Sequence, residues 1–97
     1  MSDAELRFTF HAVERMQTRG IAVAEAITVL REGLLVARDR EGTPRPSETR
    51  IGWVREGEAR ARLAVVSSVE ANGDTLIITV FWPDPEKWNA DFTKRLR

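Results

Sequence analysis

Cysteine is absent from this sequence of 97 residues, and histidine occurs once, as His11. Without cysteine the chain can form no disulfide, no Fe–S cluster, no thiolate metal site and no cysteine nucleophile. A zinc site needs several His or Cys ligands, and this chain offers one. We therefore expect neither a metal nor a cofactor.

Long apolar segments are also absent from the sequence. No apolar run approaches the roughly 20 residues that span a bilayer, and the first residues, MSDAELRF, lack the apolar stretch of a secretory signal. These two absences predict a cytoplasmic protein that does not associate with membranes. The length predicts one domain over residues 1–97, because so short a chain has no room for a second core.

An excess of either charge is missing too. Fifteen Lys and Arg balance fifteen Asp and Glu, so the formal net charge is zero. Dedicated nucleic-acid binders are usually basic overall, because phosphate neutralisation supplies much of their affinity. An anion-binding site in this protein must therefore be a local cluster of arginines.

The first third of the chain has the pattern of a strand followed by two helices. Leu6, Phe8 and Phe10 alternate with polar residues, as in a short strand with one buried face. Apolar residues then recur at helical spacing over 11–19 and 22–32, and a glycine ends each segment. We expect these two helices to form a hairpin.

The remaining chain has the pattern of a sheet. Strands are predicted at 34–36, 51–55, 60–70 and 75–82, whereas 38–50 has two prolines and the composition of a loop. Asp84 and Pro85 are typical of a helix start and predict a C-terminal helix that carries Trp88 and Phe92. We therefore expect an α+β fold, with the N-terminal helical hairpin packed on an antiparallel sheet of four to five strands and a helix at the C-terminus.

The dipeptide Asn72-Gly73 predicts a two-residue turn between the last two strands. In that register Val66 opposes Thr79. One face of the sheet is then almost wholly apolar and should lie under the helices; it contains Leu63, Val65, Val69, Leu76, Ile78, Val80 and Trp82. The opposite face mixes guanidinium and hydroxyl groups with apolar side chains, among them Arg60, Arg62 and Thr79. This mixed face is the candidate working surface.

The most informative motif surrounds the single histidine. His11 precedes Arg15 by one helical turn and Arg19 by two. An imidazole titrates near pH 6.5, so it can serve as an acid or a base at neutral pH, and arginine binds phosphate in a bidentate manner. The alternative is that His11 caps the helix and both arginines are solvated surface residues. The three tryptophans are better interpreted as packing residues than as base-stacking platforms.

The same stretch resembles a known family. FTFHAVERMQTRGI, from Phe8 to Ile21, fits the pattern F-x-x-H-A-x-x-R-M-x-x-R-G-I and resembles the opening of DUF4258, a family of domains of unknown function. TLIITVFW, over 75–82, resembles that family's closing strand. The family in turn resembles the RelE/ParE-type toxins and other metal-independent ribonucleases, in which a helical hairpin packs on an antiparallel sheet.

The resemblance implies a toxin-like domain, a metal-independent ribonuclease of a toxin–antitoxin system with RNA and an antitoxin protein as partners. The positions that match are His11, Arg15, Arg19 and Thr79. His11 would act as acid or base, Arg15 would stabilise charge on the phosphate, and Thr79 would orient a phosphate oxygen. Arg19 and Arg62 are candidates for substrate binding, and Arg45, between two prolines, is a third.

A second hypothesis comes from a different class of function. The chain could keep the same fold and use the Arg-bearing sheet face to bind a protein partner without catalysis. Zero net charge and the absence of tyrosine favour this hypothesis, whereas His11, Arg15 and Thr79 favour the ribonuclease. The identity of a partner and the oligomeric state do not follow from the sequence.

Overall fold

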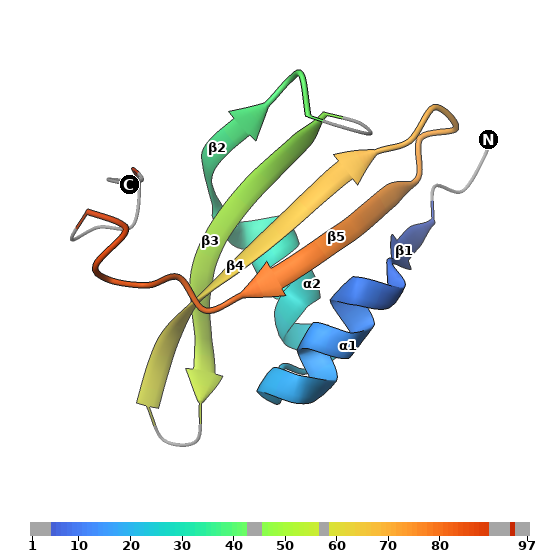
Figure 1. Cartoon of the computed structure of the whole chain (residues 1–97). Coiled ribbons are helices and arrows are strands. Elements are labelled where there is room, and N and C mark those ends of the chain that lie inside the picture. Colours follow the sequence, from blue (N-terminus) through green and yellow to red (C-terminus); the bar gives the residue numbers. More distant parts are fainter. Residues whose placement is uncertain (1–4, 43–45, 57–58, 90–93, 95–97) are drawn as a thin grey trace.

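The computed structural model describes residues 5–42, 46–56, 59–89 and 94. Two helices lie against one five-stranded sheet, whose strands stand in the order β1-β5-β4-β3-β2 (Figure 1). In chain order the elements are β1 (Leu6–Phe8), α1 (Phe10–Arg19), α2 (Val23–Glu32), β2 (Leu34–Asp39), β3 (Ser47–Glu56), β4 (Ala59–Val69) and β5 (Thr75–Phe81).

Local capping explains where α1 begins and ends. The Thr9 hydroxyl accepts a hydrogen bond from the backbone N–H of Ala12 at 3.0 Å, which satisfies one of the free amides of the first turn. Gly20 ends the helix with φ +66°, a conformation that side-chain-bearing residues rarely adopt. The predicted helix end at Gly20 is therefore confirmed, and the helix starts at Phe10, one residue earlier than predicted.

The sheet is mixed, and the prediction of an antiparallel sheet was wrong. β1 pairs with β5 in parallel, with Leu6 beside Thr75 and Phe8 beside Ile77, whereas the other three strand pairs are antiparallel. The alternation of Leu6 and Phe8 identifies a strand but carries no information about its partner or direction. Those depend on contacts with a strand almost 70 residues away in sequence, such as the bond from Thr75 N–H to the carbonyl of Glu5 at 2.9 Å.

The predicted C-terminal helix was also wrong, because none is present among the residues described after β5. Asp84 caps a single turn, in which it accepts bonds from the backbone N–H groups of Glu86 and Lys87. Trp88 is then only 5% exposed and packs against Ile51 and Ala64. The indole ring of Trp88 thus covers part of the sheet, in place of the helix predicted from Asp84 and Pro85. Phe92, which was expected in that helix, lies outside the described residues.

The β4–β5 hairpin differs from the expected one in its turn. Val66 opposes Thr79 as predicted, but Ser67 opposes Ile77, so Ile78 is an extra residue in β5. The backbone N–H of Glu70 bonds to the carbonyl of Asp74, which leaves a three-residue loop with Gly73 at φ +91°. Because the bulge shifts by one position the residues of β5 that lie between the turn and Ile78, Ile77 is buried under the helices where Ile78 was expected.

The predicted central loop is shorter than expected. β2 continues to Asp39 and β3 begins at Ser47, so Arg38, Asp39 and residues 47–50 belong to paired strands. The carboxylate of Glu48 binds the guanidinium of Arg38 at 2.8 Å and that of Arg50 at 3.1 Å. The Arg38–Glu48 pair joins the two strands and the Arg50–Glu48 pair lies along β3, and both stabilise strands whose composition is that of a loop.

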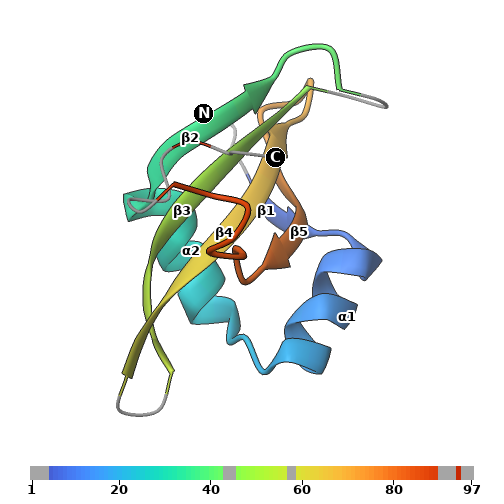
Figure 2. The same ribbon diagram turned by 60° about the vertical axis from the view of Figure 1, so that its left-hand side comes forward.

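The sheet has two differently covered faces (Figure 2). The inner face lies under α1 and α2, and its core comprises Ala12, Met16, Ile21, Ala26, Val29, Val54, Leu63, Val65, Ile77 and Val80. The outer face, on the opposite side, has a smaller cluster in which Val36 and Phe81 pack around Ile51, Ala64 and Trp88. The segment after β5 therefore covers the middle of the outer face, and the end of the β3–β4 hairpin remains open.

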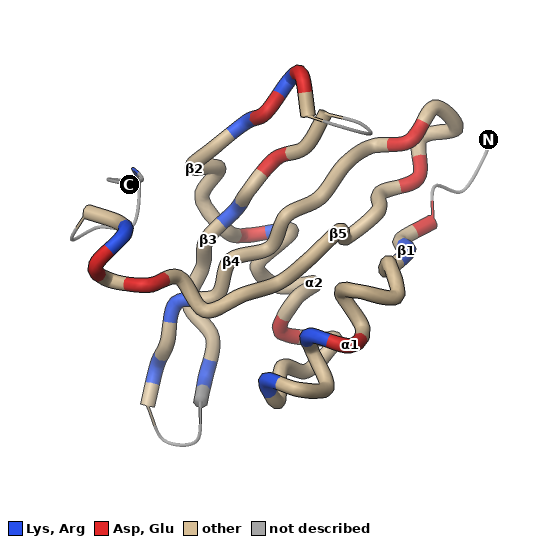
Figure 3. Tube along the Cα trace, in the orientation of Figure 1, with Lys and Arg blue, Asp and Glu red and all other residues tan. Residues whose placement is uncertain are grey.

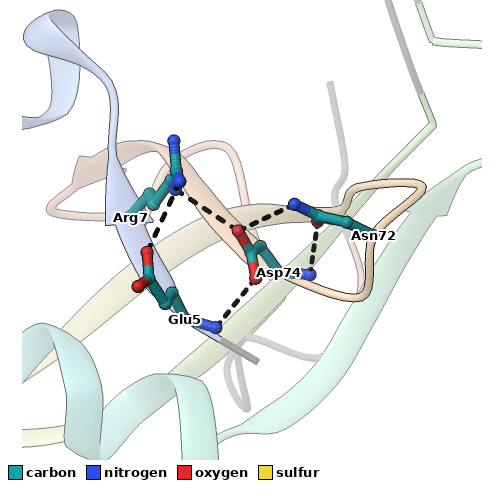
Figure 4. A network of polar contacts seen from close by, with 4 residues as sticks. All are labelled: Glu5, Arg7, Asn72 and Asp74. Atoms are coloured by element: carbon teal, nitrogen blue, oxygen red, sulfur yellow. Dashed lines mark hydrogen bonds and ion pairs between the residues drawn. The ribbon is translucent and has the colours of Figure 1, made fainter. Parts of the chain in front are cut away.

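A buried carboxylate fastens β1 to the β4–β5 turn (Figure 4). Asp74 accepts a hydrogen bond from the backbone N–H of Glu5 at 2.8 Å and one from the Asn72 side chain at 3.1 Å. Arg7 lies 3.3 Å from the same carboxylate. Three separate contacts thus satisfy a side chain that is 8% exposed.

Candidate functional site

The open end of the outer face carries an aromatic and basic cluster. We call Trp53 and Arg55 of β3, with Arg60 and Arg62 of β4, the Trp53 cluster. Trp53 pairs directly with Arg62, and Arg55 pairs with Arg60. Between these two pairs lies the pair of Val54 and Ala61, whose side chains are on the inner face. Strand alternation therefore places the four side chains on one face.

The geometry of the cluster is that of a cation–π stack. The guanidinium carbon of Arg62 lies 4.2 Å from the centroid of the Trp53 ring, and that of Arg60 lies at 4.6 Å. A tryptophan face attracts a guanidinium within about 6 Å, and the stacked group keeps N–H donors at its edge. Since Trp53 is still 47% exposed, the stack is a surface feature and does not belong to the core.

The charge on this part of the molecule has one sign among the described side chains. In Figure 3 the described end of the β3–β4 hairpin shows blue bands and no red ones, whereas both colours occur on β2, on α1 and in the turn after β5. The sequence 53–62 also contains Glu56 and Glu58, so its formal excess is one positive charge. Alternation nevertheless gathers the three arginines on the outer face.

A hollow of about 270 Å³ lies beside the cluster. Three residues of α2 and three of β3 line it: Ala24, Glu25, Thr28, Trp53, Val54 and Arg55. It borders the stretch of β3 beyond Ile51, the last β3 residue that pairs with β2. In the described structure, residues 53–56 pair with β4 and with no strand on their other side.

A second basic group, at the β2–β3 hairpin, is largely neutralised. Arg38 and Arg50 share the carboxylate of Glu48, and a hollow of about 230 Å³ lined by Arg38, Arg40, Ser67 and Ser68 lies next to it. Burial acts to raise the pKa of Glu48, but hydrogen bonds and attraction from Arg50 and Arg38 outweigh it, so this pKa lies below its ordinary value. Glu48 is therefore ionised at neutral pH, and its negative charge offsets the positive charge of the arginines that would attract an anion.

The predicted catalytic residues are distributed over two layers. His11 and Arg15 are exposed on successive turns of α1, and Arg19, also exposed, is the last residue of this helix. Thr79 precedes Val80, which is fully buried on the inner face, so the side chain of Thr79 lies on the outer face. α1 packs on the inner face, which places His11 and Thr79 on opposite sides of the sheet.

The predicted substrate-binding residues separate in the same way. Arg62 is half-buried in the Trp53 cluster on the outer face, and Arg19 belongs to the helical layer. Arg45 lies outside the described residues. The structure thus joins Arg62 to Trp53 and Arg60, and joins His11 to Arg15, but does not join the two groups.

Trp53 and Arg55 were not predicted as site residues, and Arg60 was predicted only as a member of the mixed sheet face. A signal was present in the sequence, because Trp53 and Arg55 alternate with Val54, and Arg60 and Arg62 alternate with Ala61. β3 and β4 pair so that Trp53 faces Arg62. The interpretation of tryptophan as a packing residue holds for Trp88, which is 5% exposed, but Trp53 is exposed on the outer face.

The described residues contain neither a candidate metal site nor a candidate membrane-spanning helix. No group of three or more His, Asp or Glu side chains in this part of the chain could hold a metal ion. Among the same residues, neither helix is long and apolar enough to cross a membrane.

Comparison with known proteins gives one result. The chain matches no curated protein and no solved structure. The family model of DUF4258, described as a domain of unknown function, matches residues 8–82, which span the chain from the end of β1 to just past β5. The match covers more than three quarters of the 97 residues, and the chain therefore belongs to the DUF4258 family.

Proposed function

We propose that this domain is a binding module that engages an anionic partner through the Trp53 cluster, without catalysis on that surface. The observation that carries the proposal is the pair of guanidiniums held over Trp53 at 4.2 and 4.6 Å. Stacking limits the conformations of two long side chains before a partner arrives, so less entropy is lost when they bind an anion. The chain as a whole is neutral, so a local cluster must supply the attraction.

Polyanion binding by matched arginine variants tests this proposal. We would measure binding of polyglutamate and of poly(U) at low and at high salt to the wild type, Arg60→Gln and Arg62→Gln, with Arg31→Gln as control. Arg31 is an exposed arginine near the end of α2, away from the cluster. We expect each cluster variant to bind about tenfold more weakly, since arginines of this kind dominate binding surfaces, and the control to bind like the wild type. Equal losses in all three variants, or no binding by the wild type at low salt, would refute the proposal.

The ribonuclease is the second candidate, favoured by the exposure of His11 and Arg15 on successive turns of α1. In this proposal the domain is related to the RelE/ParE-type toxins, acts on RNA in the cytoplasm and is held inactive by an antitoxin protein. The ribose 2′-oxygen attacks the adjacent phosphorus, and the bond to the 5′-oxygen breaks, leaving a 2′,3′-cyclic phosphate and a 5′-hydroxyl. A base takes the proton of the 2′-hydroxyl, and an acid donates one to the leaving oxygen.

The residues proposed for this reaction can be tested one by one. His11 would serve as the base or the acid, with Glu14 or water in the other role, while Arg15 stabilises the charge on phosphorus. Thr79, on the opposite side of the sheet, cannot reach the same phosphate and therefore serves as the control. We would follow RNA cleavage in the presence of EDTA, and growth on expression, for the wild type, His11→Ala, Arg15→Gln and Thr79→Val. Loss of cleavage and toxicity in the His11 and Arg15 variants, with wild-type cleavage by Thr79→Val, would support a site on α1, and an inactive wild type would refute the reaction.

A further inference from the structure

The free edge of β3 is a place where an additional strand can be added to the sheet. Pairing between β2 and β3 ends where Leu34 meets Ile51, and β3 continues to Glu56. Within the described residues, the backbone from Trp53 to Glu56 makes no hydrogen bond outside its pairing with β4. An unpaired strand edge offers N–H and C=O groups to any extended chain that lies beside it.

The surroundings of this edge differ on its two sides. On the outer side stand Arg55 and, one strand further, Arg60 and Arg62 over Trp53. The 270 Å³ hollow lies on the side of α2, and its lining includes the small or apolar side chains of Ala24, Thr28 and Val54. The polar groups of α2 in this hollow already have partners, since the Thr28 hydroxyl donates to the carbonyl of Ala24 and the Glu25 carboxylate accepts from the backbone N–H of Ala22.

We propose that the edge from Trp53 to Glu56 binds an extended peptide in which acidic and small apolar residues alternate, as an added strand beside β3. Successive side chains of a strand point to opposite faces. The peptide side chains on one face would therefore lie over the arginines of the Trp53 cluster and should be acidic. The peptide side chains on the other face would enter the hollow and should be small and apolar. This inference rests on the proposed function and specifies its partner as a protein segment.

The peptide explains more of the surface than a polynucleotide does. Arginines over an exposed tryptophan would suit a phosphate chain equally well. The open backbone and the adjoining hollow, however, provide the main-chain bonds and the alternate pocket that characterise strand addition. Arginines on an edge can also serve only to prevent unwanted strand pairing, and in that case no peptide would bind.

Short synthetic peptides test the inference directly. We would titrate the ¹⁵N-labelled full chain with a peptide of alternating Glu and Val, with a version that has Lys in place of Glu, and with a version that has a central Pro. We expect the Glu–Val peptide to bind, to shift the backbone amides of residues 53–56 and to protect them from hydrogen exchange. The Lys peptide should bind at least about tenfold more weakly, because like charges repel, and the Pro peptide should lose binding, because it cannot complete the ladder.

Variants of the chain separate this inference from the proposed function. Ala24 is exposed on α2, so Ala24→Trp should leave the fold intact and fill the hollow. It should abolish peptide binding and leave polyglutamate binding unchanged, whereas Arg62→Gln should weaken both. Peptide binding unaffected by Ala24→Trp, or amide shifts confined to other elements, would overturn the added strand and leave the proposed anion-binding surface in place.

Two other outcomes would change the assignment of the edge. Displacement of the peptide by poly(U) with the same amide shifts would assign the edge to a polynucleotide instead. Failure of every polyanion to bind would remove both proposals.

Discussion

Thr9 connects β1, α1 and β5 through one hydroxyl group. The hydroxyl accepts from Ala12 N–H at the start of α1 and donates to the carbonyl of Ile78 at 2.7 Å. The second bond reaches the bulge of β5, where an irregular ladder leaves a carbonyl for a side chain to satisfy. The motif that carries His11 is thus oriented by the residue two positions before it.

Substitution at Thr9 should therefore cost more than the loss of an ordinary helix cap. We expect Thr9→Ala to lower the free energy of unfolding by about 2 kcal/mol, the upper end of the range for N-caps, because two bonds are lost. Thr9→Ser keeps the hydroxyl and should cost much less. Urea unfolding of both variants measures the difference, and equal losses would show that the methyl group, and not the hydroxyl, matters at this position.

Glu48 is the residue whose ionisation should affect stability. Its folded-state pKa lies below the ordinary value, because the bonds from Arg50 and Arg38 outweigh the effect of burial. A depressed carboxyl pKa means that the unfolded chain binds the proton more readily than the folded one. The stabilisation is therefore present above the unfolded-state pKa and is lost as the pH falls through the folded-state pKa.

This pH dependence can be measured against a neutral variant. At pH 7 we expect Glu48→Gln to be less stable than the wild type by about 1 kcal/mol, since the ion pairs are partly exposed. The difference should shrink as the pH is lowered through the acidic range, where the wild-type carboxylate becomes protonated. Urea unfolding at a series of pH values tests this, and a difference that stays constant with pH would exclude Glu48 as the titrating group.

At the scale of elements, β1 is the shortest of the described strands. It has three residues and, in the described part of the chain, pairs with β5 alone, so the contacts of Asp74 with Glu5 and Arg7 form a large part of its attachment. α1 follows directly after Thr9, and β1 thereby determines where His11 and Arg15 lie relative to the sheet.

Removal of the Asp74 carboxylate should release this strand. We expect Asp74→Ala to speed amide hydrogen exchange in residues 6–8 and to lower the free energy of unfolding by about 2–3 kcal/mol, because buried donors lose a charged acceptor. Asn72→Ala removes only contacts within the turn and serves as the control. Unchanged exchange in residues 6–8 of Asp74→Ala would mean that backbone pairing alone holds β1.

Prediction at this scale succeeded where the signal is local. Glycines at 20 and 33 end the two helices, and the pairing of Val66 with Thr79 was predicted correctly. The β4–β5 turn failed because Asn-Gly fits both two- and three-residue loops, and only the packing of Ile77 under the helices selects between them. The direction of β1 failed because it is decided by a partner distant in sequence.

At the scale of the whole molecule, the sheet is covered unequally on its two faces. Two helices bury the inner face, while Trp88 and its neighbours cover only the middle of the outer face. The described ends of β3 and β4 extend beyond α2 in both views (Figures 1 and 2). The cover provided by Trp88 thus defines where the open, arginine-bearing surface begins.

The contribution of this cover can be measured by truncating the ring. We expect Trp88→Ala to lower the free energy of unfolding by about 3–5 kcal/mol, the range for a large buried aromatic, because Ile51 and Ala64 lose their contacts. Trp88→Phe should cost less. A loss below about 1 kcal/mol in the alanine variant, typical of surface positions, would mean that the core of the domain ends at β5.

The sequence by itself determined the composition, the two helices with their ends and most of the strands. The helices and strands follow from apolar residues that recur every 3.6 or every two positions, and this recurrence is a property of short segments. Only the tertiary structure decided that β1 is parallel to β5, that Trp88 packs on the outer face, and that Arg60 and Arg62 lie over Trp53. The physical reason is that register, strand partner and face coverage depend on contacts between distant segments, and a local pattern is compatible with several of them.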